Sequence, residues 1–572
     1  MVEKKRSTPL TTQEPTLLEK IFINRYRPYI SLVVIGFIVF AQCLFFDFTH
    51  LDDDVLVLRN FHFISDTSNF FKAFQTDVFW GGASDVYYRP MMTISLMIDA
   101  LPAKPTPFVF HLSNILIHLV ASCLVYVFFI KIGNSKNLSF LFAVLFTVHP
   151  VLTQAVAWIP GRNDPLLALF VLLSFIHFMN FLETKRVSYI FWHFLFFALA
   201  LFTKETALAL IVLCPLYLWL IRKESMRVLP GGVVVVGWAA IGVFWFLLRQ
   251  AAFAHPVEYT FAYITRSILS NSPAILLYIG KIIFPFNLSV VPILQDSTLW
   301  YGVIATIIVA VLLLISGNRR FNHILFGFLW FAFSMLPILI GVNPDLRHNF
   351  SEHRVYLPLL GFMIVLMEMD CIKKADFRKK DVLILCAGVI LMFSMLNVLH
   401  GRNFKDRLGF WLNAVKNSPH YVVAHNNLGS AYYSMGNLEG AEKEYTKCAT
   451  LGPLHPIVHN NLGLIYVRRG LLKEAEVEFK KALENPIFYD ALINLGHLYY
   501  RTGREREAEP LWKRAVEVNP NYPEAYSHLA VYYYNLKEFP RAIYYLNEFQ
   551  KRGGRIDPVL LRVLQSYLEV KY

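Results

Sequence analysis

The chain has 572 residues, 56% of them hydrophobic, and a mean hydropathy of +0.44. It is too long for one small domain and too apolar for an ordinary soluble protein. Its formal charge of +13 at pH 7 does not indicate a nucleic-acid partner, because much of the excess lies in short loops between apolar runs, where Lys and Arg orient a membrane protein. These bulk properties predict an integral membrane protein that binds no nucleic acid.

Residues 1–28 are polar and carry no cleavable signal pattern, so we expect a cytoplasmic tail followed by an uncleaved anchor. Residues 29–400 then hold one apolar run after another. A membrane crossing needs about 20 apolar residues. About eleven runs approach that length: 29–46, 107–130, 138–156, 165–182, 188–203, 206–221, 232–248, 299–316, 323–341, 355–371 and 381–399.

A further run, 273–291, is interrupted by Lys281, Pro285 and Asn287. The short-loop cations fall on one side of the membrane only if this run does not cross completely. They include Arg25, Arg27, Lys131, Lys136, Lys185, Arg186, Arg222, Lys223, Arg319, Arg320, Lys373 and Lys374. We therefore expect 273–291 to be re-entrant or interfacial, with the C-terminal part on the non-cytoplasmic side. The opposite parity would put the C-terminal part in the cytoplasm.

The first outer loop, 47–106, begins with Asp52, Asp53 and Asp54. Carboxylates are expensive to place near hydrocarbon, so these three must face water, a polar cleft or a cation. A solvated loop start or a helix cap is the simpler explanation. Charged and polar residues return to the same side at later hairpin ends: Arg89, His149, Lys204, Glu352, His353 and Arg354. Such a polar floor suits a substrate with an anionic head and a long apolar tail.

Polar residues also lie within the second apolar run. His111, Asn114 and His118 follow the spacing i, i+3, i+7, which places them on one face of a helix. They are candidate substrate contacts, and the alternative is that they only hydrogen-bond between helices. His149, which precedes Pro150, has a similar alternative as a simple helix end.

From about residue 419 the chain repeats with a period of about 33–34 residues. Equivalent positions are Asn427–Gly429, Asn461–Gly463, Asn494–Gly496 and His528–Ala530, with turn glycines at Gly436, Gly470 and Gly503. This period and pattern are typical of the tetratricopeptide repeat, a helix-turn-helix unit that stacks into a solenoid. We therefore assign 401–572 to a solenoid domain, whose concave groove suits an extended peptide or another protein.

Taken together, these motifs resemble a known family. They are Leu51–Asp54 with Asn60, Arg89–Pro90, His111 with Asn114 and His118, His149–Val151 with Trp158, Arg162–Asp164, Lys204, Glu352–Pro358 and the repeats. The chain resembles the GT-C glycosyltransferases of the protein O-mannosyltransferase type, in particular those with C-terminal tetratricopeptide repeats, and their bacterial relatives. The resemblance implies an all-α fold, with a GT-C transmembrane catalytic domain over 29–400 followed by the solenoid.

The resemblance also implies a hexosyltransferase that moves mannose or another hexose from a polyprenyl-phosphate carrier to a hydroxyl, with inversion, on the outer face. A carboxylate, Asp53 or its neighbour Asp52, would act as the base. Arg89, Lys204 and Arg354 would stabilise the phosphate leaving group. Further candidate contacts are Asp54, His111, Asn114, His149, Glu352 and His353. No cofactor is required, although the adjacent carboxylates are able to bind a divalent cation.

The expected partners are the lipid-linked sugar, membrane lipids and an acceptor protein whose Ser or Thr is presented by the repeats. The short polar N-terminus favours a bacterial inner membrane with the repeats in the periplasm or exterior, and the alternative is the endoplasmic reticulum with the repeats in the lumen. A non-enzymatic membrane scaffold that docks partners through its repeats is the rival function. A mere anchor would not need about eleven crossings with charged outer loops, which favours the enzyme.

Overall fold

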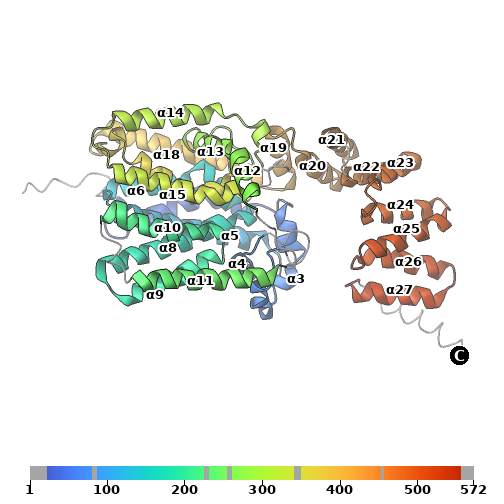
Figure 1. The fold of residues 1–572 in the computed structure, drawn as a ribbon. Helices are drawn as coiled ribbons and strands as arrows, with labels where there is room; N and C mark the ends of the chain where they lie inside the picture. The colour runs from blue at the N-terminus through green and yellow to red at the C-terminus, as the bar shows by residue number, and fades with distance from the viewer. Residues whose placement is uncertain are drawn as a thin grey trace, which may run out of the picture. The chain divides into compact units, whose positions relative to one another are not determined.

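The computed structural model describes residues 22–79, 87–102, 104–223, 231–253, 260–340, 350–452 and 456–554. Over these ranges the regular elements are helices (Figure 1), so the all-α expectation is confirmed. The chain folds into two compact units, Met1–Ser418 and Pro419–Tyr572. Residues 401–418, which the sequence assigned to the solenoid, therefore pack with the first unit, where they include helix α19 (Arg407–Asn417).

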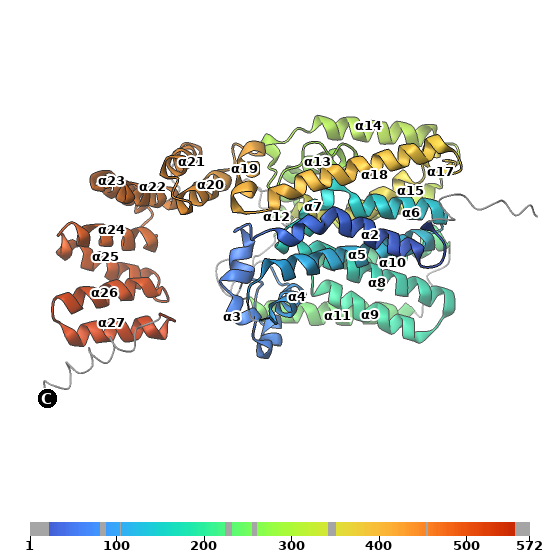
Figure 2. The ribbon, with the colours of Figure 1, turned by 180° about the vertical axis from the view of Figure 1, so that it is seen from behind.

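The first unit is a bundle of apolar helices that lie side by side in both views (Figures 1 and 2). Seven helical segments of the described chain are long and apolar enough to cross a membrane: Arg27–Phe45, Pro107–Lys131, Ile159–Thr184, Glu205–Arg222, Gly232–Ala252, Phe321–Ile340 and Lys380–Phe404. The pair Lys136–Val148 and Pro150–Ala157, bent by 47° at His149, makes an eighth if it counts as one span. The protein is thus a multi-pass membrane protein.

The expected number of about eleven crossings stays a prediction. Three of the expected spans form shorter helices: α9 (Val187–Leu201), α14 (Trp300–Ile315) and, within 355–371, α16 (Pro358–Leu366). In the interrupted run 273–291, helix α13 (Pro273–Ile283) ends before Phe284. Eleven residues are too few to cross a bilayer as a helix. A helix of this length is what we expect of a re-entrant or interfacial segment.

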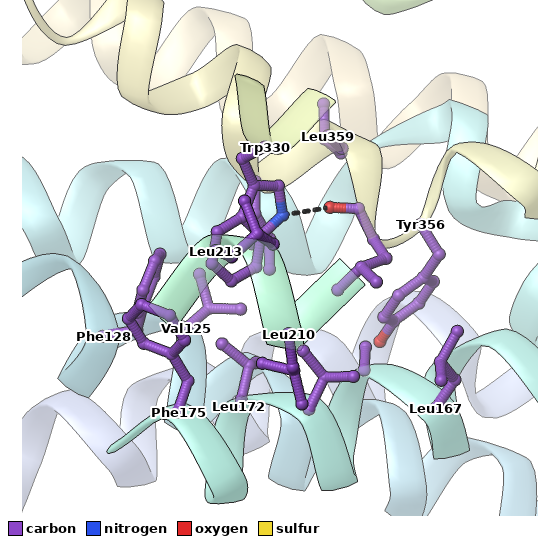
Figure 3. Packing of buried hydrophobic residues seen from close by; sticks show 14 of the residues in the cluster. Val125, Phe128, Leu167, Leu172, Phe175, Leu210, Leu213, Trp330, Tyr356 and Leu359 are labelled. Atoms are coloured by element: carbon purple, nitrogen blue, oxygen red, sulfur yellow. Dashed lines mark hydrogen bonds between the residues drawn. The ribbon is translucent and has the colours of Figure 1, made fainter. Parts of the chain in front are cut away.

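The core of this unit anchors the chain just beyond the short turn Glu352–Val355. Trp330 of α15 (Phe321–Ile340) packs its ring 5.1 Å from that of Phe128 and donates a hydrogen bond from Nε1 to the carbonyl of Leu357 at 3.0 Å (Figure 3). The Tyr356 hydroxyl lies 2.7 Å from Nδ1 of His118. These two buried contacts fix Tyr356 and Leu357, and with them the short turn Glu352–Val355.

A close helix crossing continues this anchor. Helix α16 (Pro358–Leu366) lies so near α15 that a Cβ on Gly361 would stand 2.5 Å from the carbonyl oxygen of Gly327. Small residues at a crossing let two backbones approach in a membrane protein. Glycine at both positions therefore allows α16, which follows the turn Glu352–Val355, to pack closely against α15.

The second unit consists of paired antiparallel helices (Figure 2). The pairs are α20 with α21 (Val422–Ser434, Leu438–Leu451), α22 with α23 (Pro456–Arg468, Leu472–Ala482), α24 with α25 (Tyr489–Arg501, Glu505–Val518) and α26 with α27 (Pro523–Asn535, Phe539–Lys551). The turn glycines have positive φ, as at Gly436 (78°), and Lys537 adopts φ 58° where the fourth glycine is replaced. The helical repeats are confirmed.

Candidate active site

The three consecutive carboxylates Asp52, Asp53 and Asp54 interact with different partners. Asp53 is 1% exposed, and its Oδ2 accepts hydrogen bonds from the backbone N–H of Thr49 at 2.8 Å and from the Thr49 hydroxyl. Asp54 pairs with Nδ1 of His50 at 2.7 Å. Asp52 is half-buried and interacts electrostatically with Arg89 and Arg354. Asp52 thus interacts with cations of two distant hairpins, and Asp54 interacts with Arg59 and Arg407 in addition to His50.

Burial makes the carboxyl groups of Asp52 and Asp53 unusually basic. It raises the pKa of Asp52 to about 6, although Arg89 and Arg354 act in the opposite direction. Burial likewise raises the pKa of Asp53 to about 7, partly offset by the hydrogen bonds from Thr49. A carboxylate with a pKa near 6 is still mostly ionised at neutral pH and accepts a proton more readily than an ordinary one.

The cations come from hairpins far apart in the sequence. The N–H of Met91, at the start of α4 (Pro90–Ala100), donates to the carbonyl of Phe202 at 3.1 Å, which joins the residues beside Arg89 to those beside Lys204. The Arg89 guanidinium lies 4.3 Å from the ring centroid of Tyr87. No described residue hydrogen-bonds to this guanidinium, so its donors remain available to an anion.

Asp164, at the start of α8 (Asn163–Thr184), contacts two members of what we call the cation group: Arg89, Lys204, His353 and Arg354. Its Oδ1 lies 2.8 Å from Nζ of Lys204, and its Oδ2 lies 3.8 Å from Nε2 of His353. Burial lowers the pKa of Lys204, opposed by Asp164 and assisted by Arg89. Burial also drives the pKa of His353 well below its usual value, with Arg354, Lys204 and Arg89 adding to the effect.

The structure thus brings the three predicted phosphate contacts together. Arg89, Lys204 and Arg354 all act electrostatically on His353, while Asp52 and Asp164 are the carboxylates that face them. Glu205 is a third carboxylate that acts on Lys204. The two guanidinium groups of Arg89 and Arg354 are the features of this site that suit a phosphate.

The other predicted contacts are engaged inside the fold. Asn114 donates from Nδ2 to the carbonyl of Trp158 at 3.0 Å and accepts from Nε of Arg162 at 2.7 Å. His149 lies 3.1 Å from the carbonyl of Ile282 through Nε2 and accepts from the N–H of Val151 at 3.2 Å. These partners explain both side chains without a substrate.

His111 and Glu352 are likewise buried. The ring of His111 packs at 6.0 Å against that of Phe46. Glu352 is 0% exposed, and its Oε1 lies 2.5 Å from Nζ of Lys281. Direct contact of either side chain with a substrate, the role expected for both, remains a prediction that neither their burial nor their partners favours.

Two residues near the site, Thr49 and Asp99, were not among the predicted site residues. Trp158 donates from Nε1 to the Thr49 hydroxyl at 3.1 Å, and its ring lies 5.5 Å from that of His353, so it joins the Asp53 loop to the cation group. A single residue such as Thr49 in an apolar stretch of sequence does not predict this contact. Asp99 was detectable as a lone acid in an apolar segment, and it pairs with Arg162 at 2.6 Å.

A divalent cation finds no clear set of ligands here. Among the described ranges of the chain, no group of three or more His, Cys, Asp or Glu side chains gathers in a way that could hold a metal ion. The separate partners of Asp52, Asp53 and Asp54 explain why three adjacent carboxylates do not converge.

An apolar cavity of about 470 Å³ opens beside the cation group. Tyr87, Tyr88 and Glu205 line it, and they are immediate sequence neighbours of Arg89 and Lys204. Its remaining lining residues are Leu208, which precedes α10 (Ala209–Leu216), and residues of α10, α11 (Gly231–Ala252) and α15: Ala209, Val212, Trp245, Arg249, Phe333, Leu336, Pro337 and Ile340. An apolar hollow next to a cationic site matches a molecule with a charged head and a hydrocarbon chain.

Substitution of Arg162 and of Arg89 should affect the stability of the protein very differently. We expect Arg162→Gln to lower the free energy of unfolding by about 3–5 kcal/mol, because it leaves the buried Asp99 carboxylate without its cation. Arg89→Gln should change it little, since no described residue hydrogen-bonds to that guanidinium. The midpoint of thermal unfolding in detergent measures both, and equal losses would contradict the separation of a structural from an available arginine.

Comparison with known proteins shows what the chain as a whole resembles. The family model described as "Tetratricopeptide repeat" matches residues 426–489 and 493–557. The protein O-mannosyl-transferase TMTC4 of Mus musculus is 26% identical over 75% of this chain and 67% of its own length. The human TMTC4 protein is 25% identical over 64% and 59%, and the protein O-mannosyl-transferase F38B6.6 of Caenorhabditis elegans 24% over 75% and 63%.

The aligned parts of the human and nematode relatives cover less than two thirds of those proteins. Within that span the similarity includes most of the chain, and the family model identifies its C-terminal helical pairs. The expected resemblance is therefore confirmed: this multi-pass membrane protein is similar to the protein O-mannosyl-transferases and carries C-terminal tetratricopeptide repeats.

Proposed function

We propose that the chain is a protein O-mannosyltransferase that moves a hexose from a polyprenyl-phosphate donor to a Ser or Thr hydroxyl on the non-cytoplasmic face. The observation that carries this proposal is the half-buried Asp52, faced by Arg89 and Arg354 beside the pair of Lys204 and Asp164. The names of the relatives support the reaction class.

Asp52 fits the catalytic base better than Asp53. A hydroxyl is a poor nucleophile, and a carboxylate that accepts its proton as the new bond forms makes it a better one. Asp52 retains exposed surface, whereas Asp53 is buried and bound to Thr49. In this role Asp53 holds the loop that presents Asp52.

The proposed step balances without a co-reactant. The acceptor oxygen attacks the anomeric carbon, the bond from that carbon to the lipid phosphate breaks, and the phosphate leaves with the bonding electrons. The hydroxyl proton passes to Asp52. Attack from the side opposite the phosphate inverts the anomeric configuration. Arg89, Lys204 and Arg354 stabilise the negative charge that develops on the leaving group.

The apolar cavity beside Tyr87 and Glu205 supports a lipid rather than a nucleotide carrier. Its walls are mainly apolar, although Glu205 and Arg249 contribute charged groups, so it suits an isoprenoid chain whose phosphate lies among the cations. The repeats fit this picture as the part that recruits the acceptor protein. A non-enzymatic scaffold is the alternative, and it is favoured only by the repeats themselves.

The base is tested by Asp52→Asn, which keeps the size of the side chain and removes its proton affinity. We expect transfer of mannose from polyprenyl-phosphate mannose to a peptide to fall by about 10²–10⁴-fold. Asp66→Asn, an exposed carboxylate of the same loop, serves as the matched control. Unchanged transfer in the Asp52 variant, combined with loss of cellular function on deletion of 419–554, would establish the scaffold instead.

The pH dependence gives an independent test. Asp52 must be ionised to accept a proton, so kcat/KM should decline below a pH of about 6. Arg89→Gln removes a cation that stabilises the carboxylate and therefore raises the pKa of Asp52. The acid decline of this variant should then begin at higher pH than in the unmodified protein. A decline that stays in place, or moves to lower pH, would exclude Asp52 as the titrating base.

A further inference from the structure

The short turn Glu352–Val355 carries His353 and Arg354 into the candidate site, and buried side chains hold it from the opposite side. Oε1 of Glu352 lies 2.5 Å from Nζ of Lys281 and accepts from the N–H of Ser289 at 2.7 Å. Oε2 of Glu352 lies 3.1 Å from Nε2 of His400, near the end of α18 (Lys380–Gly401). Oε1 is thus held by two donors, whereas Oε2 approaches His400 without a hydrogen-bond partner among the described residues.

Gln154 of α7 (Thr153–Ala157) closes the first part of the same turn. Its Oε1 accepts hydrogen bonds from the N–H groups of Glu352 at 2.7 Å and His353 at 3.3 Å. Its Nε2 donates to the carbonyl of Val290 at 2.9 Å. Gln154 is buried, so its amide satisfies backbone groups that would otherwise lack partners away from water.

The segment Ser289–Pro292 ties these contacts to the rest of the first unit. The N–H of Phe350 donates to the carbonyl of Pro292 at 2.7 Å, and the N–H of Val290 donates to Oδ1 of Asn413 in α19 at 3.1 Å. The turn Glu352–Val355 is therefore attached to α7, α13, α18 and the segment Ser289–Pro292.

These attachments matter because transition-state contacts are exacting. A guanidinium stabilises a leaving phosphate only when its donors are held near the productive geometry, and an error of about 1 Å costs up to about 100-fold in rate. Neither Glu352 nor Gln154 is exposed, so neither touches the substrate. Their contacts instead fix the backbone from which His353 and Arg354 extend toward Asp164 and Asp52.

We propose that Gln154 and Glu352 are positioning residues for the transfer reaction, acting through the turn that bears His353 and Arg354. This inference rests on the proposed function, because it assigns Arg354 to the phosphate of the donor. It also gives Glu352 a role other than the substrate contact expected from the sequence.

Gln154→Leu tests the inference without creating an unpaired charge. In the full-length protein in detergent, hydrogen exchange of peptides covering 350–357 should accelerate, because two N–H groups lose their acceptor. The value of kcat/KM for polyprenyl-phosphate mannose should fall about tenfold. Gln42→Leu is the matched control, since Gln42 also donates to a backbone carbonyl, that of Val398, and has no contact with the turn among the described residues.

A double-mutant cycle with Arg354→Lys separates positioning from general damage. If Gln154 acts through Arg354, adding Gln154→Leu to Arg354→Lys should lower kcat/KM by less than about threefold. Fully additive losses, unchanged exchange over 350–357, or faster exchange with unchanged turnover would each overturn the inference. If the unmodified protein transfers no sugar, the proposed function fails, and the exchange measurement alone then decides whether Gln154 holds the turn.

Discussion

The ion pair between Lys204 and Asp164 is the interaction on which the rest of the candidate site depends. Its atoms are 2.8 Å apart and the two side chains are almost fully buried. A buried ammonium without a carboxylate would be costly, so Asp164 allows a cation to lie under the outer loops. Asp164 begins α8, and the positive end of a helix dipole favours a carboxylate there. His353 approaches the second oxygen of Asp164, which brings Arg354 to the same place.

The remaining charges are arranged around this pair. Arg89 reaches it because the start of α4 is hydrogen-bonded to the end of α9, and its own guanidinium keeps its donors available among the described residues. Asp52 faces Arg89 and Arg354 but retains exposed surface. Asp52 thus combines a raised pKa with exposed surface, whereas Arg162 and Asp99 form a closed, buried ion pair.

Much of this could be predicted from the sequence, for physical reasons that differ by element. The repeats were evident because each helical pair repeats the same packing, with Gly463 lying against Phe479 and Gly496 against Trp512. The gathering of Arg89, Lys204 and Arg354 was expected because all three lie at hairpin ends predicted to share one side of the membrane. The choice between Asp52 and Asp53 could not be made, because it depends on a hydroxyl at Thr49 whose contact spans only the local loop.

Other features depend on tertiary contacts that no sequence spacing encodes. The spacing of His111, Asn114 and His118 correctly puts them on one helix, yet Asn114 is occupied by Trp158 and Arg162 and His118 by Tyr356. Glu352 is as polar as its neighbours but points to Lys281 and His400. The number of crossings cannot be counted from the sequence alone, because one apolar run can form two helices with a bend between them, as at His149.

The most direct test of the account is equilibrium binding of a polyprenyl phosphate to the purified protein in lipid nanodiscs. The account predicts saturable binding that depends on the phosphate: the neutral polyprenol should bind much more weakly, and Arg89→Gln should weaken polyprenyl phosphate about tenfold or more, the loss of a charge-assisted hydrogen bond. Equal affinity for the phosphate and the alcohol, or equal affinity of the two proteins for the phosphate, would contradict it.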